Sequence, residues 1–122
     1  MPDLSAGKKI LIVDDDAAIL ELLRLQMQQE GYSTFLESSG RAAIELAKNP
    51  NVAAVLLDLG LGDMDGFEVL GKMRALRPEL PVIIVTGCHQ ESEGRRAFEM
   101  GAWDYVTKPI DFQYLKNILL IQ

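Results

Sequence analysis

Cysteine, long apolar runs and a leader segment are all absent or nearly absent from this sequence. Cys88 is the single cysteine, so no internal disulfide can form, which agrees with a reducing compartment. The longest apolar run covers residues 52–57, far short of the about 20 residues that a helix needs to cross a bilayer. The first nine residues carry no apolar segment of the secretory type. These absences predict a soluble, cytoplasmic protein without membrane association.

Positive charge is also scarce. Twelve lysines and arginines stand against 18 acidic residues, a net charge of −6, and no basic cluster exceeds the pairs Lys8-Lys9 and Arg95-Arg96. Contacts with phosphates dominate nucleic-acid affinity, so we expect no direct nucleic-acid binding by this segment. A chain of 122 residues with 48% hydrophobic and 25% charged residues is typical of one globular domain, expected here over residues 1–122.

Five short apolar runs alternate with segments of helical periodicity. The runs, expected as strands, are residues 10–13, 32–36, 52–57, 82–85 and 105–107. The apolar stripes between and after them are Ile19, Leu22, Leu23 and Met27; Ala43, Leu46 and Ala47; Phe67, Leu70 and Met73; Ala97 and Phe98; Leu115, Ile118 and Leu119. Strands that are apolar throughout need cover on both faces, which requires parallel pairing with helices above and below. The pattern predicts a doubly wound α/β fold.

Polar residues stand where four of these strands end. In a parallel sheet the carboxyl ends of the strands meet along one edge, where ligands of open α/β sheets bind. We therefore expect these residues to lie close together: Asp14, Asp15, Asp16, Asp58, Thr86, Lys108 and Pro109.

Three carboxylates at one edge need a cation. At 4 to 5 Å each pair would repel by roughly 4 kcal/mol at an effective dielectric of about 20. Carboxylate oxygens with no metal-binding His or Cys partners favour Mg²⁺, with Mn²⁺ as the alternative. Lys108 adds a fixed positive charge and Thr86 a hydroxyl donor. Two carboxylates that hold a metal, a third that is free to attack, a lysine and a threonine together predict phosphoryl transfer.

The stretches KKILIVDDD, VLLDLGLGDMDGFEVL, PVIIVTG and GAWDYVTKPID resemble the receiver domains of response regulators, in matching order and spacing along nearly the whole chain. The resemblance implies a flavodoxin-like (βα)5 fold with five parallel strands in the order 2-1-3-4-5. It also implies a switch of two-component signalling rather than an enzyme, although one with its own phosphorylation and autodephosphorylation chemistry. The chain is then expected to be the N-terminal fragment of a longer regulator.

The same resemblance assigns roles at the sheet edge. It makes Asp58 the acceptor of a phosphoryl group from a phosphohistidine on a sensor histidine kinase or phosphotransfer protein. Asp15 would ligate Mg²⁺ directly and Asp14 mainly through water, with Asp58 and the backbone carbonyl of Leu59 completing the metal site. Lys108 would pair with Asp58 and then with the phosphoryl oxygens.

Thr86 and Tyr105 resemble the switch pair of the family. Output, and with it homodimer formation, would pass through the face of the fourth helix, the fifth strand and the fifth helix. The resemblance also implies a cis peptide before Pro109. Gly60, two residues after the acceptor, has no side chain to shield an acyl phosphate from water, so we expect comparatively fast autodephosphorylation.

Other interpretations are open at this point. An aspartate phosphatase of the haloacid dehalogenase type usually has a second Asp where Gly60 stands. A flavin-binding module needs a phosphate-friendly loop after the first strand, which the acidic residues 14–16 oppose. A receiver-like module that binds partners without being phosphorylated is the third alternative.

Several polar residues have plainer expected roles. Asp16 is expected to cap the first helix, and Asp63 and Asp65 to be solvated or capping residues. Arg95 and Arg96 are expected on a solvated face, with Glu91 and Arg95 at the i,i+4 spacing of a helical ion pair, although contact with a partner is the alternative. Cys88 and His89 lack the companions of a metal or nucleophilic site and are expected to be structural or neutral.

Overall fold

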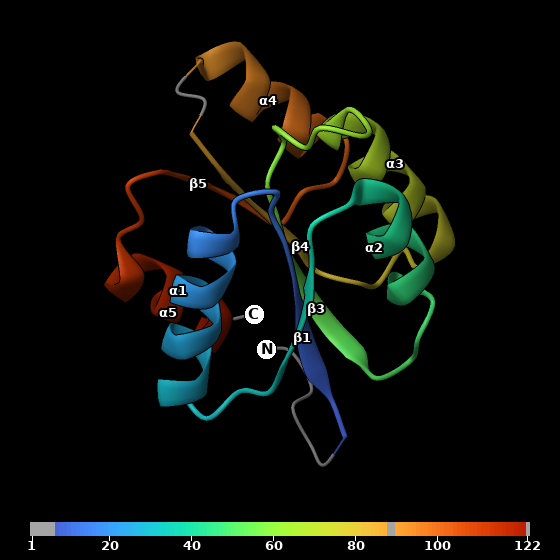
Figure 1. The fold of residues 1–122 in the computed structure, drawn as a ribbon. Helices are drawn as coiled ribbons and strands as arrows, with labels where there is room; N and C mark the ends of the chain where they lie inside the picture. The colour runs from blue at the N-terminus through green and yellow to red at the C-terminus, as the bar shows by residue number, and fades with distance from the viewer. Residues whose placement is uncertain (1–6, 88–89, 122) are drawn as a thin grey trace.

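The structure, a computed structural model, describes residues 7–87 and 90–121. Within these residues, five strands alternate with five helices: β1 (Lys9–Val13), α1 (Ala17–Gln29), β2 (Thr34–Glu37), α2 (Gly40–Ala47), β3 (Val52–Leu57), α3 (Gly66–Leu76), β4 (Val82–Thr86), α4 (Glu91–Glu99), β5 (Asp104–Thr107) and α5 (Phe112–Ile121) (Figure 1). None of the described helices is both long and apolar enough to cross a membrane.

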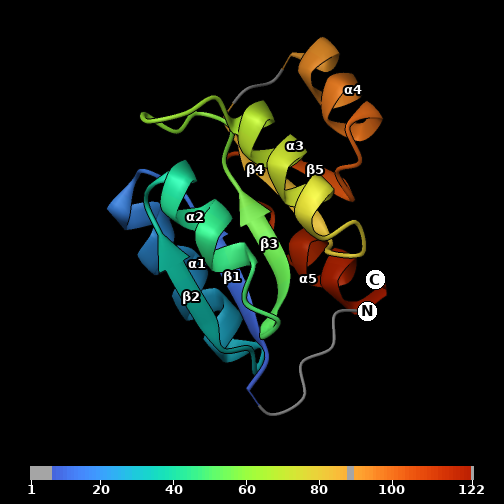
Figure 2. The ribbon, with the colours of Figure 1, turned by 90° about the vertical axis from the view of Figure 1, so that its right-hand side faces the viewer.

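The strands form one parallel sheet in the order β2-β1-β3-β4-β5, which confirms the predicted fold. Helices α1 and α5 cover one face, and α2, α3 and α4 cover the other (Figures 1 and 2). Successive side chains of a strand point to opposite faces. In β1, Ile10 and Ile12 therefore pack on α1 and α5, whereas Leu11 and Val13 pack on the opposite face.

The second strand begins later than the sequence suggested. Gly31 ends the turn after α1 with a positive φ of 89°, and the backbone N–H of Tyr32 then donates back to the carbonyl of Met27 at 2.9 Å. This bond is typical of a helix terminus that ends in a left-handed residue. Tyr32 and Ser33 thus belong to the helix exit, and the expected strand 32–36 is corrected to Thr34–Glu37.

Two residues of the expected apolar stripes do not face the sheet. Leu22 is 45% exposed and Phe98 is 52% exposed. In α1 the buried positions are Leu23 and Met27, four residues apart, so their neighbour Leu22 lies about 100° away around the helix. In α4 the buried residue is Ala97. Both exposed residues are left on the outer surface of their helices.

Candidate functional site

The carboxyl ends of β1, β3 and β4 gather the buried polar residues of the described chain. Asp14 is 1% exposed, Asp58 6% and Thr86 3%, and the rest of the buried side chains are apolar. Asp14 and Asp58 directly follow β1 and β3, and Thr86 is the last residue of β4. Burying polar groups costs free energy unless they are paired, so their concentration at one edge marks a functional site.

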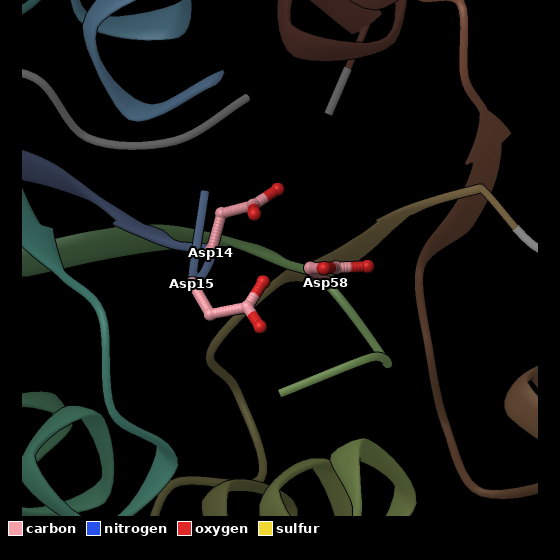
Figure 3. A group of neighbouring side chains, drawn as sticks. All are labelled: Asp14, Asp15 and Asp58. Carbon is pink, nitrogen blue, oxygen red and sulfur yellow. The ribbon is translucent and has the colours of Figure 1, made fainter. Parts of the chain in front are cut away.

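Three carboxylates converge at this edge. Asp14, Asp15 and Asp58 each offer one oxygen, and these oxygens lie within 4.8 Å of one another (Figure 3). Burial raises the pKa of Asp14, and the charge of Asp58 adds to the rise, while hydrogen bonds from Lys108 and from the Asp16 backbone N–H oppose it. Asp15 is exposed and opens the cluster to solvent. An all-oxygen cluster of this kind fits Mg²⁺, which retains waters beside one or two carboxylates.

Lys108 reaches this cluster from the end of β5. Its Nζ lies 2.7 Å from Asp14 Oδ2 and 3.6 Å from Asp58 Oδ2. Burial alone would lower the pKa of Lys108, but the hydrogen bond to Asp14 and the nearby carboxylates raise it overall, so the ammonium stays charged. The expected pairing with Asp58 is present, but Asp14 is the closer partner. The Lys108–Pro109 peptide bond is cis, as predicted.

The loop after β3 is packed tightly against the start of α3. Gly66 N donates to the carbonyl of Leu59 at 3.2 Å. A Cβ on Gly66 would lie 2.3 Å from Leu59 Cα, so the close approach admits only glycine. Asp65 caps α3 by accepting from Phe67 N at 2.8 Å. The role of Gly66 was not predicted from the sequence, although a glycine beside a helix cap is a signal of close backbone approach.

Asp63 connects the same loop to α2 through hydrogen bonds. Its carboxylate accepts from Ser39 Oγ at 3.0 Å, from Gly40 N at 2.9 Å and from Arg41 N at 3.0 Å, at the start of α2. The backbone N–H groups of Arg41 and Gly40 lower the pKa of Asp63 to about 2. The expected capping role is confirmed, but the capped helix lies 23 residues upstream. Asp16 caps α1 through Ala18 N at 2.9 Å, as expected.

A pocket of about 540 Å³ opens beside Asp58. It is lined by Asp58, Leu59, Gly60, Asp65, Phe67, Thr86, Gly87, Glu93, Arg96 and Lys108. One wall comes from the loop after β3 and the first turn of α3, and the other from the end of β4 and from α4. A Cβ on Gly60 would lie 3.7 Å from Asp58 Oδ2, so glycine leaves the carboxylate accessible on that side.

The model of the response regulator receiver domain matches residues 10–120. The chain belongs to this family. Receiver domains are the signalling switches of two-component systems and bind Mg²⁺ at a cluster of aspartates such as the one described above.

Known relatives agree with this membership. SrrA, a transcriptional regulatory protein of Staphylococcus aureus (strain NCTC 8325 / PS 47), is 41% identical over 103 residues, 84% of this chain and 42% of SrrA. The transcriptional regulatory protein ZraR of Escherichia coli (strain K12) is 36% identical over 110 residues, 90% of this chain and 25% of ZraR. This receiver domain therefore spans less than half the length of either curated relative. Neither relative supports the phosphatase or flavin-binding alternatives.

A solved structure agrees in fold. A chain of the CheX–CheY–BeF3–Mg²⁺ complex from Borrelia burgdorferi matches with a TM-score of 0.88 at 25% identity, covering 93% of this chain and 87% of that one.

The expected switch pair of the receiver domain lies on two adjacent strands. Thr86 is buried at the end of β4, and Tyr105 is half-buried in β5, paired in register with Ile84. Gly94 of α4 faces the Tyr105 ring, since a Cβ on Gly94 would lie 3.7 Å from it. The ring thus packs beneath α4.

The remaining expected residues divide into two groups. Arg95 pairs with Glu91 at 3.3 Å on the outer side of α4, as the spacing predicted. Cys88 and His89 lie outside the described residues.

Proposed function

We propose that this receiver domain accepts a phosphoryl group on Asp58 from the phosphohistidine of a sensor histidine kinase or phosphotransfer protein. The observation that carries the proposal is the convergence at one sheet edge of a buried nucleophilic carboxylate, two further carboxylates and a charged lysine. Asp58 faces an open pocket, and Lys108 Nζ lies 3.6 Å from its Oδ2.

In the proposed reaction a carboxylate oxygen of Asp58 attacks the phosphorus atom. The bond from phosphorus to the histidine nitrogen breaks, and that nitrogen keeps the electron pair. Asp14, Asp15, Asp58 and the Leu59 carbonyl would hold Mg²⁺, with Mn²⁺ as a substitute. The bound ion supplies neutralisation of charge on the phosphoryl oxygens. Lys108, whose ammonium lies 3.6 Å from Asp58 Oδ2, would offset further charge, and the Thr86 hydroxyl would donate to a phosphoryl oxygen.

The proposal is tested by incubating the protein with Mg²⁺ and acetyl phosphate and recording its intact mass. We expect the wild-type protein to gain one phosphoryl group and Asp58→Asn to gain none. Asp63→Asn is the matched control, because it removes a carboxylate from the same loop but not from the pocket. A wild-type protein that gains no mass with any phosphodonor would support the alternative of a binding module that is never phosphorylated.

We propose further that the acyl phosphate is short-lived because of Gly60. A side chain there would begin 3.7 Å from Asp58 Oδ2 and would cover the phosphoryl group against water. Gly60→Asn and Gly60→Met should therefore lengthen the lifetime of the phosphorylated protein, followed by intact mass after removal of donor. Gly62→Asn is the control, since a Cβ on Gly62 meets nothing within 4 Å. Unchanged lifetimes in both Gly60 variants would reject the idea.

Output is proposed to leave through the face formed by α4, β5 and α5, with Thr86 and Tyr105 as the switch. Large side chains on or beside these elements are exposed: Phe98 at 52%, Trp103 at 40% and Tyr114 at 46%. Such a face suits a homodimer contact whose strength changes with phosphorylation. We propose that residues 1–122 are the receiver part of a longer cytoplasmic regulator, and that any DNA binding belongs to its other segments.

A further inference from the structure

Arg96 occupies an unusual position for a helix-surface arginine. Its guanidinium carbon lies 4.1 Å from the centre of the Phe67 ring, and the residue lines the same pocket as Asp58 and Lys108. Among the described residues no carboxylate forms an ion pair with Arg96. Its neighbour Arg95, by contrast, is paired with Glu91 at 3.3 Å outside the pocket.

The Phe67 ring holds the guanidinium in place. Phe67 is 5% exposed and belongs to the first turn of α3, so the ring is fixed by the core beneath it. A guanidinium stacked on an aromatic face keeps its N–H groups at the edge of its plane, where they can donate to an anion. Gly60 and Gly87 line the same pocket without side chains, so the space between the two walls remains open.

The charges of the pocket create a need for this cation. A phosphodonor is an anion, and the carboxylates of Asp58, Asp65 and Glu93 all line the pocket that it must enter. The other cation of the pocket, Lys108, is already bound to Asp14 at 2.7 Å and to Asp58 at 3.6 Å. Arg96 is the arginine that lines the pocket, and within the described residues its guanidinium forms no ion pair with a carboxylate.

We infer that Arg96 is a second phosphate-binding residue of the site: its guanidinium binds the phosphoryl oxygens of the incoming phosphodonor. This inference rests on the proposed phosphorylation of Asp58. Lys108 and the aspartate cluster act on the side of the reacting carboxylate, whereas Arg96 acts from α4 at the opposite wall. It thereby sets how tightly the domain holds a small anionic donor before transfer.

The test compares Arg96→Gln with Arg95→Gln, since both remove one positive charge from the same helix and only Arg96 faces the pocket. The first measurement is the second-order rate constant for phosphorylation by acetyl phosphate with Mg²⁺ present, from intact mass. The second is the affinity for the phosphoryl mimic BeF3⁻ with Mg²⁺, from titration calorimetry. Loss of one charge-assisted contact should lower both by about tenfold in Arg96→Gln, and Arg95→Gln should stay within about twofold of wild type.

The dependence of the rate constants on salt concentration distinguishes the loss of a positive charge from a structural effect of the substitution. The ratio of wild-type to Arg96→Gln rate constants should fall as ionic strength rises, because added ions screen the contribution of an accessible guanidinium. A ratio that does not change with salt, or equal rates in the two variants, would overturn the inference while leaving phosphorylation of Asp58 intact. A wild-type protein that is never phosphorylated would overturn both.

Discussion

Asp58→Asn should make the metal-free protein more stable, although it removes the proposed acceptor. Asp14 and Asp58 oxygens lie within 4.8 Å, where two unit charges repel by about 3.5 kcal/mol at an effective dielectric of about 20. Exposed Asp15 adds a smaller, screened repulsion. Lys108, 3.6 Å from Asp58, attracts its carboxylate by about 4.6 kcal/mol at the same dielectric. The Coulomb contributions of these neighbours therefore nearly cancel.

The remaining contribution is the free-energy cost of burying the charged carboxylate of Asp58, which is only 6% exposed. The effective desolvation penalty of a buried ion is several kcal/mol. A neutral amide of the same shape avoids most of it. We therefore expect Asp58→Asn to raise the free energy of unfolding by about 2 kcal/mol in the absence of metal.

The assay is urea denaturation followed by circular dichroism in EDTA, repeated with saturating Mg²⁺. A ligand that binds only the folded state stabilises it by mass action. Mg²⁺ should therefore stabilise the wild-type protein more than the variant, and the difference between their free energies of unfolding should become smaller. Glu99→Gln controls for the change in net charge, because Glu99 is exposed on α4 and lies outside the pocket. If Asp58→Asn were no more stable than wild type in EDTA, Lys108 would outweigh the burial of the charge and the reasoning would be wrong.

Three further substitutions test other contacts. Asp63→Asn should make the free energy of unfolding depend less on pH in the acid range. The Asp63 carboxylate stabilises the fold fully above its ordinary pKa of 3.8 and loses this effect as the pH falls through about 2. Thermal midpoints measured across pH would show the difference between the two proteins. Arg77→Met should lower the free energy of unfolding by about 2–4 kcal/mol in urea denaturation. The reason is that Arg77 Nη1 donates to the backbone carbonyls of Ala47, Asn49 and Val52, at 3.2, 3.1 and 2.8 Å. Gly66→Ala should cost about 1–3 kcal/mol and weaken Mg²⁺ binding in calorimetry by displacing Leu59.

Sequence alone was sufficient for the sheet and for the place of the site. Residues 52–57 are apolar at every position, and such a strand is stable only with helices on both faces. Once the strands are parallel, the residues that follow them must share an edge, so Asp14 and Asp58 meet although 44 positions separate them. Both conclusions follow from the geometry of the backbone, which a pattern of residue types fixes.

The pattern could not supply contacts that depend on loop paths and side-chain reach. Asp63 lies in the loop between Leu59 and Gly66, whose backbones are in close contact, and nothing near Asp63 in the sequence indicates that it caps α2. The stacking of Arg96 on Phe67 joins α4 to α3 across the pocket and depends on how the two helices sit on the sheet. The exposure of Leu22 likewise depends on the exact rotation of α1 against the sheet.

The position of Lys108 links the metal site to the phosphoryl site. Without a phosphoryl group its ammonium lies nearer to Asp14, at 2.7 Å, than to Asp58, at 3.6 Å. Phosphorylation replaces the single charge of the Asp58 carboxylate by about two negative charges on the phosphoryl oxygens. These would draw the ammonium toward the phosphoryl group, and Asp14 would lose its partner while remaining 1% exposed. A buried carboxylate left without its cation is costly, so Asp14 then depends more strongly on a divalent ion. We therefore expect the phosphorylated domain to bind Mg²⁺ more tightly than the free one, because one lysine serves two carboxylates.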